Sequence, residues 1–156
     1  MAQISSDIRE FVSAQRLGFL ATVCPNGTPN LSPKGLTFVL DENHLAIGEV
    51  RSPQSVKNLR SNPAAEVNVV DVIARKGFRF KGSCTVHESG SEFERLLGFL
   101  RGQGAQSTIH SIIVLEVEFV ETITSPAYDS EASETDVKMK WKDRQDQQHK
   151  DLESDA

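Results

Sequence analysis

Short segments rich in β-branched and aromatic residues alternate with turn signals along most of this chain. The strongest signal is Pro25-Asn26-Gly27-Thr28, because Asn-Gly suits the positive φ angles of a hairpin turn. Short connections of this kind favour antiparallel pairing. The segments expected to form strands are 19–24, 29–40, 44–48, 65–70, 77–87 and 109–123. Because sheets with many tight turns tend to close or stack, we expect a mainly β protein: a six-stranded antiparallel barrel with short helices between strands.

Charge and apolar patterning exclude several classes of protein. The chain has 17 Lys and Arg against 22 Asp and Glu, a net charge of −5, which argues against a nucleic-acid partner. The longest apolar run, 112–115, is far shorter than a membrane helix requires, and residues 1–9 lack the apolar part of a secretory signal. Cys24 and Cys84 form no disulfide framework, so we expect a cytoplasmic protein with no membrane partner.

The C-terminal segment differs in composition from the rest. We expect one domain over residues 1–128 and a charged arm and tail over 129–156. Val137, Met139 and Trp141 alternate with charged residues, a period of two that predicts a short extended arm. From Gln145 onward a single large apolar residue remains, which predicts a solvated helix or a disordered end.

A strand end, a polar turn and a helix start follow one another at 48–59. Ser52 and Pro53 are typical of an N-cap and first helical position, and the helix should run to about Ser61. A helix N-terminus attracts anions, and Arg51 adds a guanidinium that suits phosphate. The candidate binding residues here are Val50, Arg51, Ser52, Gln54, Ser55 and Asn58. Taken alone, the pattern is more typical of a capped surface helix with solvated cations.

A second candidate stretch covers residues 30–37. Pro33 removes a strand hydrogen-bond donor, and Gly35 permits a flat ligand to approach the backbone closely. Lys34 would supply positive charge. The candidate residues are Ser32, Pro33, Lys34, Gly35 and Thr37. Taken alone, this stretch is more typical of a β-bulge at a barrel corner.

Together these stretches resemble the pyridoxamine 5′-phosphate oxidase-like, FMN-binding split-barrel family. The resemblance rests on segments 17–23, 25–33, 56–63 and 78–82, in this order and spacing, and covers residues 8–128. It implies a split barrel and a homodimer with FMN at the subunit interface. It implies that 32–35 lie along the flavin ring or ribityl chain and that 50–52 line the flavin. Gln54, Ser55 and Asn58 would approach the phosphate, and Trp141 would either cover the partner's flavin or pack on its own barrel.

The chain departs from the family pattern at two places. Gln54-Ser55 replaces a pair that is basic in many relatives, and the tail lacks the Arg-Leu-x-Pro element of pyridoxamine 5′-phosphate oxidases proper. We therefore expect a flavin-dependent oxidoreductase that passes hydride or electrons from a nicotinamide donor to a small acceptor, and not vitamin B6 oxidation. The alternatives are a non-catalytic FMN store, electron carrier or sensor, a member that uses F420 or haem, and a dimer that has lost its cofactor. No side chain is assigned a catalytic role, and the histidines show no metal-ligand spacing.

Overall fold

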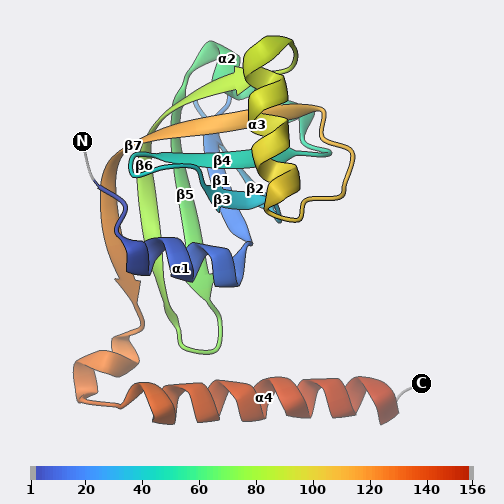
Figure 1. Ribbon diagram of the computed structural model, residues 1–156. Helices are drawn as coiled ribbons and strands as arrows, with labels where there is room; N and C mark the ends of the chain where they lie inside the picture. The colour runs from blue at the N-terminus through green and yellow to red at the C-terminus, as the bar shows by residue number, and fades with distance from the viewer. Residues whose placement is uncertain (1–2, 155–156) are drawn as a thin grey trace. The chain divides into compact units, whose positions relative to one another are not determined.

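The computed structural model describes residues 3–154 (Figure 1). Its elements, in chain order, are α1 (Ser6–Gln15), β1 (Gly18–Val23), β2 (Pro29–Lys34), β3 (Thr37–Val39), β4 (His44–Glu49), α2 (Pro53–Ser61), β5 (Ala64–Asp71), β6 (Lys76–His87), α3 (Gly90–Gly102), β7 (Ser111–Thr124), a 3-10 helix (Pro126–Ser130) and α4 (Glu134–Ser154). No helix within this part of the chain has the length and apolarity needed to cross a membrane.

The strands form one curled, antiparallel half-barrel sheet of seven strands in the order β2-β1-β5-β6-β7-β4-β3. The expected mainly β fold is confirmed, but the expected count of six strands is wrong. The segment 29–40 divides because Pro33 and Gly35 interrupt it, so that β2 pairs with β1 and β3 pairs with β4. Lys34 is thus the last residue of β2 and Thr37 the first residue of β3, and these two strands form opposite edges of the sheet. Three residue steps span at most about 11 Å, so the two edges must lie close together and the sheet must curl.

The chain divides into two compact units. The first contains the residues up to Val69 and Phe78–Glu121, and the second contains Val70–Gly77 and the residues from Thr122 onward. The first unit holds the curved body of the sheet with α1, α2 and α3, whereas the second holds the β5–β6 turn, the end of β7 and α4.

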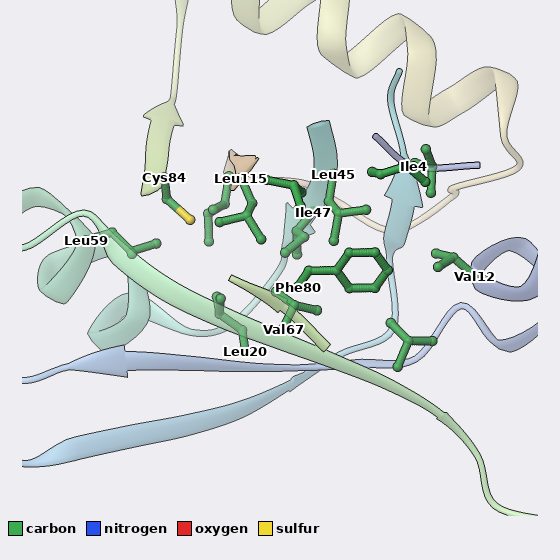
Figure 2. Close-up of a cluster of buried hydrophobic side chains, with 14 residues drawn as sticks. Ile4, Val12, Leu20, Leu45, Ile47, Leu59, Val67, Phe80, Cys84 and Leu115 are labelled. Atoms are coloured by element: carbon green, nitrogen blue, oxygen red, sulfur yellow. The ribbon is translucent and has the colours of Figure 1, made fainter. Parts of the chain in front are cut away.

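The main core of the first unit fills the concave side of the sheet. Figure 2 shows Leu20, Leu45, Val67 and Phe80 directed into one interior, and all four are fully buried. Cys84 belongs to the same cluster, and burial raises the pKa of its thiol to about 12, so it is a core residue and not a nucleophile. Helix α3 covers a second cluster that contains residues of β3, β4 and β7 (Figure 1).

One part of the tail, residues 137–141, departs from its expected conformation, whereas residues 145–154 lie on a helix, one of the two conformations expected for them. The predicted extended arm at Val137, Met139 and Trp141 is wrong, because these residues lie on the helix α4. In a helix, Val137 and Trp141 are four residues apart and share a face, whereas Met139 lies on another face and is 60% exposed. Lysines fill the alternate positions, so a period of two and a period of 3.6 cannot be told apart over five residues.

Candidate functional site

Buried polar residues of the described chain gather where β2, β4 and α2 meet. Polar side chains are costly to bury unless they are hydrogen-bonded. A cluster of buried polar side chains therefore indicates either a structural network or a binding site. The seven buried residues of this kind are Thr22, Lys34, Thr37, Glu49, Ser55, Asn58 and Ser111. They come from β1, β2, β3, β4, α2 and β7, and two of them carry charge.

Lys34 is the centre of the first half of this network. It ends β2 and is only 3% exposed. Its Nζ donates to Ser32 Oγ and, over 2.6 Å, to Ser52 Oγ, and the backbone oxygen of Lys34 accepts from Thr37 Oγ1 over 2.8 Å. An ammonium group has three N–H donors, so two are used by the serines and one is left for a ligand.

Glu49 is the counter-charge of Lys34. It ends β4 and is 5% exposed; one carboxylate oxygen accepts from the backbone N–H of Ser52 and the other from Ser111 Oγ over 3.3 Å. Burial lowers the pKa of Lys34 from its usual value, and the nearby Glu49 carboxylate offsets part of this shift. The two charges are thus joined through Ser52, which contacts both.

Ser52 stands at the N-cap position of α2 but does not cap the helix with its side chain. The expected cap is replaced by the contacts of its hydroxyl with Lys34 and Ser32. Pro53 occupies the first helical position as expected. The first turn of α2 contains no acidic side chain, so the positive end of the helix dipole is not neutralised there.

The second half of the network lies between α2 and β1. Asn58 donates to Thr22 Oγ1 over 3.0 Å and accepts from Gln54 Nε2 over 2.7 Å. Ser55, one turn before Asn58, is fully buried, and its hydroxyl has no hydrogen-bond partner. A buried hydroxyl without a partner is costly for the fold, which makes Ser55 a candidate donor to a ligand.

Two cavities adjoin the first half of the network, that of Lys34, Ser52 and Glu49. The first, which we call the strand-end cavity, has a volume of about 340 Å³ and is lined by Pro33, Lys34, Gly35, Leu36, Gly48, Val50, Arg51, Ser52 and Ser107. The second, of about 590 Å³, lies along α2, and Val50 and Arg51 line it as well. Because Arg51 lines both cavities and Lys34 lines the first, a bound anion would meet two cations here.

The structure brings most of the predicted site residues together. Six of the twelve line the strand-end cavity, namely Pro33, Lys34, Gly35, Val50, Arg51 and Ser52. Ser32 and Thr37 are bonded to Lys34, and Gln54 is bonded to Asn58. Trp141 lies in the second unit, where its ring packs against Arg75, so its proposed role toward a cofactor stays a prediction.

Sequence reasoning missed Thr22, Glu49 and Ser111. Leu45, Ile47 and Glu49 occupy alternate positions of β4, so the period of two already placed Glu49 on the same side as two core residues. Ser111 lies directly opposite Glu49 in the β4–β7 register, which no local pattern reveals.

The curled sheet and its buried cation define a small half-barrel protein with a pocket suited to an oxyanion. A family model described as pyridoxamine 5′-phosphate oxidase matches residues 4–124. The chain therefore belongs to the pyridoxamine 5′-phosphate oxidase family, and the sequence resemblance is confirmed.

Solved structures share this fold. The protein HupZ of Group A Streptococcus superposes with a TM-score of 0.70 at 24% identity, covering 78% of this chain and 95% of that one. An FMN-binding protein of Syntrophomonas wolfei gives a TM-score of 0.62 at 13% identity over 76% of this chain and 84% of that one. A protein named F420 reductase gives a TM-score of 0.59 at 19% identity, covering 76% of this chain and 98% of that one. No curated protein matches the sequence significantly.

Proposed function

We propose that this protein binds FMN in the strand-end cavity and acts as a flavin-dependent oxidoreductase. The observation that carries the proposal is the buried ammonium of Lys34, which has one N–H donor left for a ligand at the wall of this cavity. A buried cation of this kind suits an anionic cofactor. The family match and the similarity to a protein described as FMN-binding support FMN as that cofactor.

The residues fit FMN at both ends of the molecule. Lys34, Gly35 and Arg51 would lie along the flavin and its ribityl chain, and the unpartnered hydroxyl of Ser55 would donate to the phosphate. Bound flavin supplies hydride and electron transfer, and the protein supplies position and electrostatics. Positive charge from Lys34 and Arg51 favours the negative charge of a reduced ring. A deazaflavin of the F420 type would meet the same cations, so it is the competing ligand.

The spectrum of the purified protein and its response to nicotinamide donors test this function. We expect flavin absorbance bands and bleaching by NADH or NADPH faster than that of free FMN. FMN binding without any bleaching would instead favour a store or carrier. A colourless protein that takes up F420 but not FMN would overturn the proposed cofactor.

The proposal includes a homodimer. The outer face of the sheet in the first unit carries exposed apolar side chains, among them Phe19, Leu31 and Phe119, which are 37%, 67% and 62% exposed. A groove of about 430 Å³ lies on the same face, and Ala21, Val23 and Phe119 are among its lining residues. Contiguous apolar surface of this kind is typical of subunit interfaces. Light scattering should give twice the mass of the chain, and Phe119→Asp should shift the protein toward the monomer.

Removing the proposed contacts of Arg51 and Ser55 should weaken FMN binding. We expect Arg51→Ala combined with Ser55→Ala to raise the Kd for FMN at least tenfold, because charge-assisted contacts contribute about 1.5–3 kcal/mol each. Titration of flavin fluorescence measures the Kd. Arg95→Ala is the matched control, because Arg95 is an exposed arginine paired with Glu92 on α3. An unchanged Kd in the double variant would place FMN away from these two residues.

Burial of Lys34 gives FMN binding a pH dependence. The pKa of Lys34 lies below its usual value of 10.5, so its positive charge is present at low pH and is lost as the pH rises through this lowered pKa. As the pH rises, FMN affinity should therefore begin to decline at a lower pH than it would if Lys34 had the pKa of an ordinary lysine. Lys34→Met should bind FMN more weakly and lack this decline. Parallel affinity–pH curves for the two proteins would contradict the prediction.

A further inference from the structure

Two arginines of the second unit gather on the ring of Trp141. The guanidinium carbon of Arg75 lies 3.4 Å from the centroid of this ring, and that of Arg144 lies 5.5 Å from it. Cation–π contacts of this length are favourable. The Nζ of Lys140 lies 5.7 Å from the same centroid. Like charges that share one aromatic ring repel each other, so the cluster is stable only where something compensates.

The β5–β6 turn fixes Arg75 in place. Asp71 Oδ1 accepts from the backbone N–H groups of Ile73 and Ala74, and the Arg75 N–H donates to the Asp71 backbone oxygen over 2.8 Å. Tyr128 Oη donates to the Ala74 backbone oxygen over 2.6 Å. Arg75 itself has a φ of 56°, in the left-handed region. This turn therefore holds the guanidinium beside Trp141 before any ligand binds.

Two lysines of the same unit, Lys76 and Lys138, are neutralised, whereas the two arginines are not. Lys76 and Lys138 each pair with Glu134 over 2.8 Å, and these contacts lower the pKa of Glu134 to about 2. Within residues 3–154, no carboxylate pairs with Arg75 or Arg144, and the Nε of Arg75 is buried with no acceptor. The positive charge beside Trp141 thus lacks a protein counter-ion.

A cavity of about 380 Å³ lies at this place. It is lined by Val72, Arg75, Trp141, Arg144, Gln145 and Gln148, a set with two cations, two amides and no carboxylate. Guanidinium and amide N–H groups are the donors that recognise phosphate oxygens, and Val72 with the indole offers an apolar wall. We propose that this cavity binds a small phosphate monoester, with its phosphate on Arg75 and Arg144. Apart from Trp141, this site uses other residues than those predicted or proposed for FMN.

The single tryptophan of the chain makes the proposal directly measurable. Trp141 fluorescence of the full-length, FMN-free protein should change saturably on titration with an alkyl phosphate monoester, and more weakly with inorganic phosphate, which cannot use the apolar wall. Sodium chloride at matched ionic strength should produce no saturable change. A response equal to that of chloride would overturn the proposal, as would tighter binding of a polynucleotide than of the monoester.

Arg144→Gln is the decisive variant, because Arg144 is exposed on α4 and its loss should not disturb folding. We expect its Kd for the monoester to rise at least tenfold. Lys142→Gln removes a cation from the same helix but not from the cavity, and it should bind as the parent does. Equal Kd values in Arg144→Gln and the parent would show that the arginines only pack on Trp141. FMN affinity, measured in parallel, should be the same in all three proteins, so failure here is distinguishable from failure of the proposed FMN site.

Discussion

Glu49→Ala is expected to lower the free energy of unfolding by about 3–5 kcal/mol, because it leaves a buried charge without its nearby counter-charge. Here the remaining charge is Lys34, which is 3% exposed. The substitution also leaves the backbone N–H of Ser52 and the hydroxyl of Ser111 without their acceptor. Urea denaturation followed by circular dichroism measures the loss.

A double-variant cycle separates the charge from the packing. If Lys34 is what makes Glu49→Ala costly, then Lys34→Met combined with Glu49→Ala should be less destabilised than the sum of the two single variants. Glu94→Ala, at an exposed position of α3, should stay within about 0.5 kcal/mol of the parent. Strict additivity of the two buried substitutions would contradict the coupling of Lys34 and Glu49.

Gly82→Ala is expected to destabilise the protein by about 3 kcal/mol or more, at the upper end of the effects of overpacking. A Cβ at Gly82 would lie 1.8 Å from the backbone oxygen of Glu116, so that β6 and β7 would have to separate. Backbone atoms of a central strand cannot move aside as a flexible side chain does. The loss should appear as a lower urea midpoint with little change in slope.

Gly98→Ala is the matched control for this substitution. Gly98 lies inside α3, and apart from its two chain neighbours and the backbone of its own helix, no heavy atom lies within 4 Å of the position that its Cβ would take. Alanine is a better helix former than glycine by about 0.8–1 kcal/mol, so this variant should be as stable as the parent or more stable. Equal losses of stability in Gly82→Ala and Gly98→Ala would show that the close approach of β6 and β7 does not determine the destabilisation.

Local signals predicted the elements better than their connections. The helix after Ser52-Pro53 ends at Ser61 as expected, because N-cap, proline and the Asn62-Pro63 stop are encoded in adjacent residues. The division of 29–40 between two sheet edges was not predicted, since it depends on which distant strand each half pairs with. Residues 137–141 were mistaken for an extended arm because their apolar side chains fit two periods equally well.

The candidate site shows the same division between local and long-range information. Lys34, Arg51 and Ser55 were proposed from the residue types beside a helix start and a broken strand, together with the family resemblance. The burial of Lys34 was not predicted, because it results from the curl of the sheet, which brings Ser52 beside Lys34 although the two are 18 positions apart in the sequence. Glu49 was overlooked because its counter-charge is distant in the sequence, although the alternation of residues along β4 places Glu49 on the same side of the strand as core residues.

The fixed position of Lys34 also affects how a ligand would bind. A free lysine side chain loses up to about 2 kcal/mol of rotamer freedom when it is immobilised. The hydroxyls of Ser32 and Ser52 already restrict the ammonium group of Lys34 in the folded chain. This entropy is therefore lost during folding and not during association, so the pocket is preorganised, and most of the attraction between cation and anion remains available as affinity.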